Sequence, residues 1–194
     1  MMFQRVVKTV AYRNGLFADF SPKPIEYAPG NGFHINMSVK PLEDPGVFRG
    51  MIAGILGNVR AMTAFLNPTE ASYSRLGKNK APGYVSWSAE NRSQLIRIPA
   101  AVGEFRRAEL RSPDPCANPY LAFALMIWAG LQGIGSGAPL PEPADINLYK
   151  AAPETLARYE KLPASFGEAC AAAAASDFIR AHVPAEILSI YCER

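Results

Sequence analysis

The chain has 194 residues, of which 49% are apolar and 19% charged, and its formal net charge is +3. Length and composition are those of one globular domain that is large enough to bury a core. The net charge is too small to indicate nucleic acid or a membrane surface as a partner. The sequence has no apolar run of 18 residues, so we expect no transmembrane helix.

Three cysteines, Cys116, Cys170 and Cys192, lie far apart in the chain. Their odd number and wide spacing indicate neither a disulfide framework nor a zinc site, so we expect free thiols in a reducing cytoplasm. Residues 1–15 lack the apolar stretch and the small-residue cleavage site of a signal peptide. We expect the chain to begin almost directly in a helix, like the middle of a larger fold.

The N-terminal part of the chain predicts two helices and two strands. Apolar residues recur at helical spacing over residues 3–14, and short strands are expected at residues 18–23 and 32–40. Asp44, with the proline that follows it, is a predicted N-cap for a long helix that ends at Asn67.

The middle of the chain predicts a loop and three strands. Two glycines, a proline and two lysines mark residues 76–83 as a loop. Strands are expected at residues 84–88, 92–98 and 105–111. The order of elements predicts an α+β fold, with an antiparallel sheet and flanking helices.

The C-terminal part predicts helices. Asn118 is a predicted N-cap, and the helix after it is apolar nearly all round, so we expect it to be deeply buried. Ser165 and Glu168 have the spacing of a capping box, and a last helix is expected at residues 184–190.

The strand at residues 32–40 has one polar and one apolar face. Side chains alternate along a strand, so His34, Asn36 and Ser38 share one face, opposite an apolar stripe. The polar face predicts either a binding surface or a half-exposed strand that turns this side to solvent.

The strand at residues 105–111 places Arg107, Glu109 and Arg111 on one face. A carboxylate between two guanidinium groups stays ionised, which suits a hard metal ion. The alternative is a ladder of surface salt bridges. Arg92 and Arg97 are an odd number of residues apart, so they share a ligand only if the strand bends or bulges, or if Arg92 precedes it.

Together these residues predict a sheet that offers histidine, glutamate and several arginines. Guanidinium groups bind phosphate or carboxylate, so the set has the chemistry for a metal-bound polyphosphate beside a carboxylate. The sequence contains neither a P-loop nor a dinucleotide-binding glycine motif, which excludes those two kinds of nucleotide site.

Several runs of this sequence resemble glutamine synthetases of the bacterial type I class. They are GFHINMS, NPTEASYSRL, SWSAENRSQLIRIPA, RAELRSPDPCANPYLAFALMIWAGLQGI and NLYK. The resemblance implies that residues 1–194 are the C-terminal part of that family's catalytic domain. The family's N-terminal β-grasp domain and the first catalytic strands have no counterpart here.

The resemblance also implies an activity. The family joins glutamate and ammonia with ATP through a γ-glutamyl phosphate, uses Mg²⁺ or Mn²⁺, and forms homo-oligomers whose sites lie between subunits. The expected partners are ATP, glutamate, ammonium or another amine, and either further copies of the chain or a missing N-terminal half.

Site residues follow from the resemblance, position by position. The implied metal ligands are His34 and Glu109. The implied nucleotide contacts are Asn36, Ser38, Arg92, Arg97 and Arg107. The implied substrate contacts are Gly30, Arg75 and Arg111. The implied catalytic residues, around the phosphoryl group in transfer, are Arg92, Arg97 and Arg111. This requires His34 and Glu109 to point into one cleft.

Departures from the family pattern leave alternatives open. Asn36 stands where the family has a second histidine, and Lys80 stands at the flap position of a glutamate that helps to deprotonate ammonium. A cation there repels ammonium. One alternative is therefore a γ-glutamyl-amide ligase for another amine. Another is a truncated, non-catalytic paralogue that only binds nucleotide or partner subunits. Uncovered sheet edges and apolar faces predict self-association of the lone chain.

Overall fold

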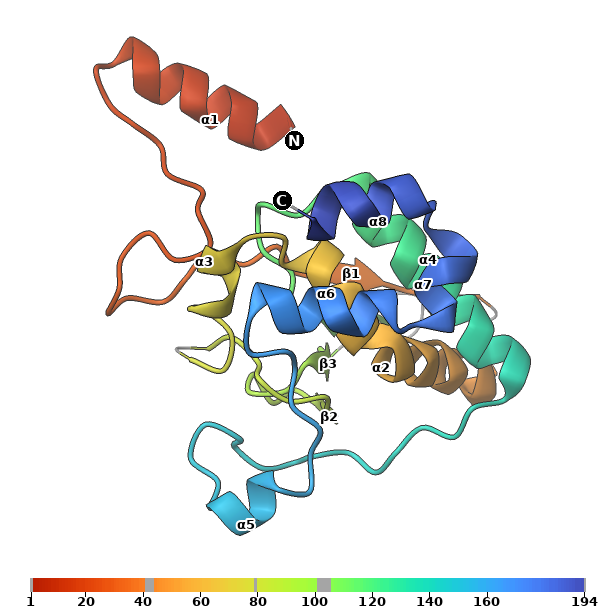
Figure 1. Cartoon of the computed structure of the whole chain (residues 1–194). Helices are drawn as coiled ribbons and strands as arrows, with labels where there is room; N and C mark the ends of the chain where they lie inside the picture. The colour runs from red at the N-terminus through yellow and green to blue at the C-terminus, as the bar shows by residue number, and fades with distance from the viewer. Residues whose placement is uncertain (1, 41–43, 79, 101–105, 194) are drawn as a thin grey trace.

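The computed structural model describes residues 2–40, 44–78, 80–100 and 106–193 (Figure 1). A small sheet lies beside a group of helices, and the first helix, α1 (Met2–Arg13), projects from the rest of the molecule. Within the described ranges no helix is long and apolar enough to cross a membrane.

The sheet has four strands in the order β1-β4-β3-β2. They are β1 (Ile35–Met37), β2 (Trp87–Ala89), β3 (Ile96–Ile98) and β4 (Ala108–Leu110). β4 pairs antiparallel with β1 and β3, whereas β2 and β3 are parallel. The sheet is thus mixed, which corrects the purely antiparallel arrangement expected from the sequence, while the α+β class and the flanking helices are confirmed.

β1, β3 and β4 lie within predicted strands but are shorter, whereas β2 is shorter and shifted, since it was expected at residues 84–88 and covers residues 87–89. The expected strand at residues 105–111 starts at a residue outside the described ranges. The strand expected at residues 18–23 is wrong, because this segment is coil. Pro22 has no amide hydrogen to donate to a ladder, and its carbonyl accepts from the Asn31 N–H at 2.9 Å instead.

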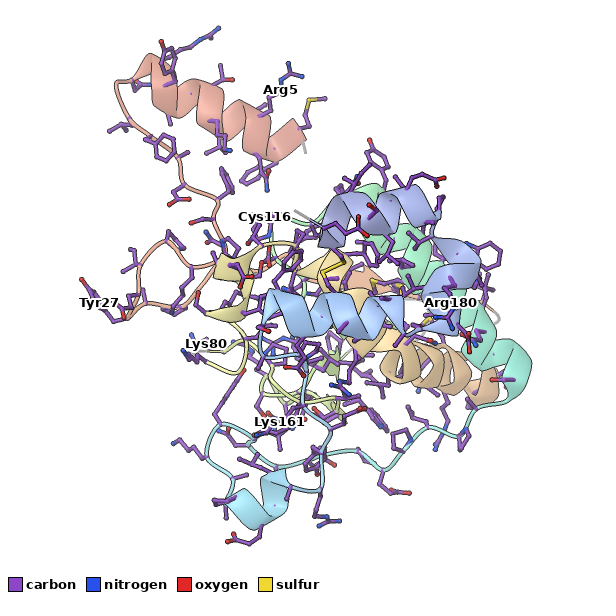
Figure 2. The ribbon with its side chains drawn as sticks, viewed as in Figure 1. Arg5, Tyr27, Lys80, Cys116, Lys161 and Arg180 are labelled. Carbon is purple, nitrogen blue, oxygen red and sulfur yellow. A yellow bond between two sulfur atoms is a disulfide. The ribbon has the colours of Figure 1, made fainter. Side chains whose placement is uncertain are left out.

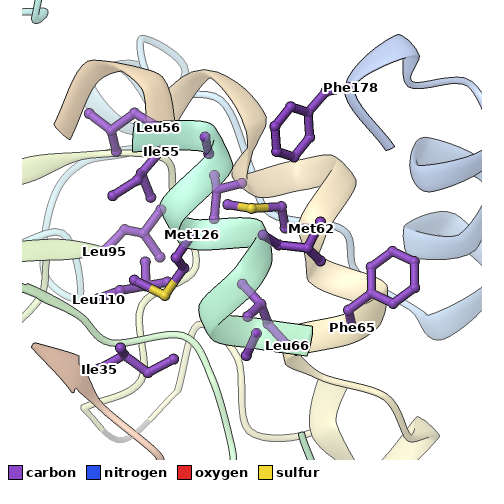
Figure 3. Packing of buried hydrophobic residues seen from close by; sticks show 14 of the residues in the cluster. Ile35, Ile55, Leu56, Met62, Phe65, Leu66, Leu95, Leu110, Met126 and Phe178 are labelled. Carbon is purple, nitrogen blue, oxygen red and sulfur yellow. The ribbon is translucent and has the colours of Figure 1, made fainter. Parts of the chain in front are cut away.

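Two long helices form the core with the sheet. The Asp44 side chain accepts the Gly46 N–H and caps α2 (Pro45–Leu66), which is buried along most of its length. α4 (Pro119–Ser136) crosses α2 at glycines, since a Cβ on Gly54 would lie 2.0 Å from the Ala129 carbonyl oxygen. Side chains from α2, α4, α7 and the strands interlock around this crossing (Figure 3).

The deep burial expected for α4 is wrong. One face packs on α2 through small and medium side chains, and the opposite face is exposed. We call its large apolar side chains the α4 stripe: Tyr120, Phe123, Ile127, Trp128 and Leu131. Among the described residues, one side of this helix packs on α2, whereas the other side stays largely exposed, although Phe123 meets Phe33 and Trp128 meets His182. An all-round apolar composition therefore does not lead to all-round burial.

The remaining helices are short. They are α3 (Glu70–Tyr73), α5 (Pro153–Leu156), α6 (Phe166–Ala174), α7 (Asp177–His182) and α8 (Ala185–Cys192). Ser165 caps α6 by accepting the Glu168 N–H, and the Glu168 carboxylate accepts the Ala164 N–H. The predicted capping box is therefore present in a shifted form. The Glu168 carboxylate accepts the N–H of Ala164, one residue before the N-cap, instead of the N–H of Ser165 itself.

A disulfide joins α6 to α8. It links Cys170 to Cys192, and Figure 2 shows the bond in yellow. The expectation of free thiols is therefore wrong for these two residues, because the fold brings together helix positions that are distant in sequence. Cys116 is an exposed free thiol, as expected.

Candidate active site

The strand faces predicted from the sequence are confirmed. His34, Asn36 and Ser38 are exposed on one side of β1, while Ile35 is buried on the other side. Asn36 lies opposite Glu109 of β4, and Glu109 lies opposite Arg97 of β3. Three neighbouring strands thus place their polar side chains at one point on the sheet.

Glu109 is at the centre of this group. Its side chain is 11% exposed, and its two oxygens have different partners. Oε1 lies 2.8 Å from His34 Nδ1, Oε2 lies 2.7 Å from a terminal nitrogen of Arg97, and Arg111 Nε is 3.9 Å from Oε1. His34 and Glu109 therefore point into the same cleft, as the sequence analysis requires for a shared cation.

The charges around His34 decide its protonation. Burial lowers the pKa of His34, and the Arg111 guanidinium lowers it further. The carboxylate of Glu109 acts in the opposite direction but does not reverse the shift. His34 is therefore a neutral imidazole near neutral pH, which is the form that can bind a metal.

Arg111 and Arg75 form a rigid floor. Arg111 donates to the carbonyl oxygens of Arg92 and, at 3.2 Å, of Lys80. Arg75 is almost fully buried and donates to the carbonyl oxygens of Ser112 at 2.6 Å and Arg111 at 3.2 Å. Burial lowers the pKa of Arg75. These bonds fix both guanidinium groups by main-chain atoms, so they need no ligand to hold their positions.

A cavity of about 390 Å³ lies over this floor. Its lining residues are Pro29, Gly30, Gly32, His34, Arg75, Lys80, Ala81, Arg92, Arg97, Glu109 and Arg111. Gly30 packs against Arg75 so closely that a Cβ would lie 2.9 Å from Arg75 Cγ. Seven of the ten residues proposed from the sequence for metal, nucleotide and substrate meet here.

The cavity is strongly cationic. Five Arg and Lys side chains line it against one carboxylate. Within the part of the chain that the structure describes, the guanidinium of Arg92 and the ammonium of Lys80 have no hydrogen-bond or ion-pair partner. Arg97 Nε and Arg111 Nε are buried without a hydrogen-bond acceptor there, although Arg111 Nε lies 3.9 Å from Glu109 Oε1. Unpaired cations and donors around a concave site favour a polyanionic ligand.

Arg92 reaches the cavity in one of the ways that the sequence analysis left open. β3 starts at Ile96, so Arg92 lies in the turn before the strand and is not bound by its alternation. The Tyr149 hydroxyl donates to the Arg92 carbonyl at 3.3 Å. Neither this tyrosine nor the main-chain contact of Lys80 could be found from spacing, because both depend on loops that meet only in the folded chain.

Three predicted residues lie outside this cavity. Arg107 Nε donates to Asn36 Oδ1 at 3.1 Å on the sheet surface. Asn36 and Ser38 line a second cavity of about 430 Å³ between β1 and α4. Of the nucleotide contacts expected from the sequence, Arg92 and Arg97 therefore line the first cavity, Asn36 and Ser38 line the second, and Arg107 reaches the second through Asn36.

The chemistry of His34 and Glu109 fits a divalent cation in kind. An imidazole and a carboxylate 2.8 Å apart are suitable donors for Mg²⁺ or Mn²⁺. Over the described ranges, no third His, Cys, Asp or Glu joins them. Two protein donors leave most of an octahedral site to other ligands.

Fold and site together define a class: a helix-flanked sheet with a cationic cavity around a His–Glu pair. The family model for the glutamine synthetase catalytic domain matches residues 1–194. The chain is 40% identical to the glutamine synthetase of Methanosarcina mazei, over 97% of this chain and 46% of that protein. It is 41% identical to that of Methanocaldococcus jannaschii, over 86% of this chain and 40% of the relative.

Solved structures agree. A GmaS/ADP complex superposes with a TM-score of 0.84 at 30% identity, covering 99% of this chain and 48% of the other. GmaS without ligand gives a TM-score of 0.82 at 31% identity. The chain therefore belongs to the glutamine synthetase catalytic-domain family, as its motifs predict, and it spans about half the length of these relatives.

Proposed function

We propose that this chain provides the C-terminal half of the active site of an ATP-dependent ligase that makes glutamine. A glutamate oxygen would attack the γ-phosphorus of ATP and release ADP. Ammonia would then attack the acyl carbon of γ-glutamyl phosphate and release phosphate. The observation that carries the proposal is the cavity of five cationic side chains around the His34–Glu109 pair, in a chain of this family. The cytoplasm is the compartment we propose.

The arginines would have different roles, depending on whether main-chain hydrogen bonds already fix their side chains. Arg75 and Arg111 have fixed positions on the cavity floor, which suits recognition of the glutamate carboxylates, with Gly30 leaving room beside Arg75. Arg92 is unpaired and Arg97 keeps a buried Nε unused, so both can turn donors to a phosphoryl group. Donors in place before charge develops lower the barrier without reorganisation.

His34 and Glu109 would hold the divalent cation that accompanies the ATP phosphates. When bound, Mg²⁺ or Mn²⁺ supplies Lewis-acid polarisation of phosphate oxygens. The role of the protein is to keep His34 neutral and Glu109 oriented, through burial and the 2.7 Å bond from Arg97. Asn36, Ser38 and Arg107, beside the second cavity, would contact the rest of the nucleotide.

Partners follow from the incomplete donor set. The remaining cation ligands would come from an N-terminal half, either in trans or from neighbouring copies in a homo-oligomer. The test is to co-express the chain with the N-terminal half of the Methanosarcina mazei glutamine synthetase. Glutamine formation would be assayed with glutamate, ATP, Mg²⁺ and ammonium.

The expected result is turnover in the co-expressed pair that Arg92→Met reduces by about a hundredfold or more. The control is Arg158→Met, an exposed arginine far from the cavity along the chain. Turnover by the chain alone would contradict the proposed need for a second half. Equal turnover in the Arg92→Met pair would contradict the proposed site.

Lys80 favours a second candidate, a γ-glutamyl-amide ligase for another amine. Its unpaired ammonium lines the cavity and repels a small cation such as ammonium. The same co-expressed pair would be assayed with methylamine and larger primary amines. Faster turnover with one of them than with ammonium, lost in Lys80→Glu, would support this candidate over glutamine synthesis.

A third candidate is a non-catalytic chain that binds nucleotide or partner subunits only. Calorimetry of the lone chain with Mn²⁺ and ATP separates it from the ligase when read beside the co-expression assay. Binding without turnover in any pairing would support the non-catalytic candidate.

A further inference from the structure

A buried polar cluster lies next to the Arg75 side chain and takes no part in the site described so far. Its members are Asn67, Ser72, Ser112 and Asp114, each at most 1% exposed. Asn67 is the C-cap of α2, Ser72 belongs to α3, and the other two residues follow β4. Polar groups at this depth are kept in place by hydrogen bonds, so the partners of each group show what the cluster holds.

The Ser112 carbonyl joins this cluster to the cavity floor. Its oxygen accepts Arg75 Nη1 at 2.6 Å and Asn67 Nδ2 at 2.9 Å. The direction of the Arg75 guanidinium therefore depends on a main-chain oxygen that Asn67 also binds. The same amide nitrogen of Asn67 donates to Asp114 Oδ2 at 2.9 Å.

Asp114 determines which way the Asn67 amide faces. An ionised carboxylate can only accept hydrogen bonds, so the nitrogen of the Asn67 amide must face it. A reversed amide would turn its oxygen toward both the carboxylate and the Ser112 carbonyl. The observed orientation leaves Asn67 Oδ1 buried without a donor in the described part of the chain, and the two bonds of Nδ2 offset that cost.

The surroundings of Asp114 favour the ionised form that this arrangement needs. Burial raises the pKa of Asp114, whereas the Cys116 N–H, the side chains of Ser72 and Asn67, and the Arg75 guanidinium act in the opposite direction. The Cys116 N–H donates to Oδ1 at 2.9 Å, so both carboxylate oxygens have donors. Hydrogen bonds to the charged form stabilise it against the effect of burial.

The segment from Ser112 to Asp114 also links α2 to the first strand. The Asp114 N–H donates to the Leu66 carbonyl at 3.2 Å, at the end of α2. The Phe33 N–H donates to the Pro113 carbonyl at 2.8 Å, directly before His34. The cluster is thus connected to two separate parts of the cavity lining.

We propose that Asp114 and Asn67 are positioning residues of the glutamate site. Together they orient the Ser112 carbonyl, which holds the Arg75 guanidinium where it binds a carboxylate of glutamate. This inference rests on the proposed function, in which Arg75 recognises that substrate. Neither residue lines the cavity, so both act through Arg75.

Two substitutions of nearly unchanged size disturb this arrangement. Asp114→Asn replaces one acceptor by a donor, which faces either the Asn67 nitrogen or the Cys116 N–H. The Asn67 amide then reverses toward the Ser112 carbonyl, or a bond is lost. Asn67→Asp removes the donor to Ser112 and places a second carboxylate beside Asp114.

The first test measures the position of Arg75 without any need for turnover. The lone chain is treated with phenylglyoxal, which modifies accessible guanidinium groups, and each arginine is followed by peptide mass spectrometry. In the wild type the exposed Arg92 should react quickly and the buried Arg75 slowly. Each variant should raise the rate at Arg75 by about tenfold, the effect of about one hydrogen bond to a charged group.

Gly54→Ala is the control for general loosening, because it disturbs the α2–α4 crossing and not this cluster. It should leave Arg75 as slow as in the wild type. Far-UV circular dichroism checks that each variant is folded, and one folded variant is enough for the test. An unchanged rate at Arg75, the same increase in Gly54→Ala, or loss of folding in both variants would overturn the proposal.

The second test uses the chain co-expressed with the N-terminal half. Each variant should raise the KM for glutamate by about tenfold and leave kcat and the KM for ATP unchanged, because Arg75 binds the substrate before and during the reaction alike. A fall in kcat at an unchanged KM would contradict the positioning role. Absence of turnover in the wild-type pair would count against the proposed function, and the phenylglyoxal rates would then decide the positioning of Arg75 alone.

Discussion

At the scale of single residues, Glu109 determines the charge balance of the cavity. Both of its oxygens are engaged, by His34 and by Arg97. A buried carboxylate that loses a charged partner keeps its desolvation cost without compensation. The partners of Glu109 are therefore needed for folding as well as for any chemistry in the cavity.

This gives the first prediction. Arg97→Met should lower the free energy of unfolding by about 3 kcal/mol, because it leaves Glu109 Oε2 buried without the guanidinium that lies 2.7 Å from it. Adding Glu109→Gln in the double variant should restore part of the loss. Urea unfolding measures both, with Arg158→Met as the exposed control. If Arg97→Met is as stable as the wild type, the Arg97–Glu109 pair contributes nothing to the free energy of unfolding.

The second prediction concerns pH. The pKa of His34 in the folded chain is lowered from its ordinary value of 6.5. As the pH falls through 6.5, the unfolded chain therefore binds a proton at His34 before the folded chain does. The contribution of His34 to stability is therefore present above about pH 6.5 and is lost as pH falls through the folded pKa. Urea melts in EDTA at about pH 7.5 and about pH 5.5 measure the loss.

In His34→Gln this part of the pH dependence should disappear. His182→Gln keeps His34 and should retain it, so the second histidine serves as the control. A pH dependence that His34→Gln leaves unchanged would assign it to other groups.

The sequence predicted which faces of the strands these residues occupy, but it did not predict the hydrogen bonds that hold them. Alternation along two short strands was enough to place His34 with Asn36, and Glu109 with Arg111, because a strand has no freedom in which face a side chain takes. The fixing of Arg111 by the Lys80 carbonyl was not predictable. It depends on a loop in which Lys80 has a positive φ of 76°, and neither spacing nor composition encodes that contact.

At the scale of elements, the α2–α4 crossing depends on glycine. The third prediction is that Gly54→Ala destabilises the chain by about 2 kcal/mol, because its Cβ would meet main-chain atoms of α4 that cannot move aside. Gly57→Ala, three residues along the same helix, meets nothing within 4 Å and should stabilise it by about 0.5 kcal/mol or more. Thermal melts compare the two, and equal effects would contradict the close crossing.

The fourth prediction concerns the link between α6 and α8. Cys170 and Cys192 close a loop of 22 residues, so reduction should lower stability by about 3 kcal/mol. Chemical denaturation with and without a reductant measures this in a Cys116→Ser background, which removes the free thiol. No change on reduction would mean that the two sulfurs are not joined in solution.

The helices show where composition misleads. The caps at Asp44 and Asn118 were predictable from local chemistry, and α2 and α4 begin there. The exposure of the α4 stripe was not, because the number of partners around a helix is a property of the whole fold and not of the helix sequence.

At the scale of the whole molecule, the chain consists of a packed body and a helix that buries nothing. The fifth prediction is that deleting residues 1–17 leaves the thermal midpoint of the body unchanged at low concentration, since α1 has no buried residue. Deleting residues 185–194 should lower the midpoint, because α8 supplies the Tyr191 ring, 5.0 Å from Phe65, and Cys192. Circular dichroism on heating measures both, and a large loss from the first deletion would contradict this division.

The positions of the two tryptophans make their intrinsic fluorescence a probe of the α4 face. Trp87, on β2, donates its indole N–H to the Pro141 carbonyl at 2.7 Å, whereas Trp128 sits on α4 with its ring 4.7 Å from that of His182 and half exposed. A chain that keeps Trp128 and has phenylalanine at the other position would therefore emit only from the uncovered helix face. The wavelength of its emission maximum would therefore report the solvent exposure of that face without an attached dye.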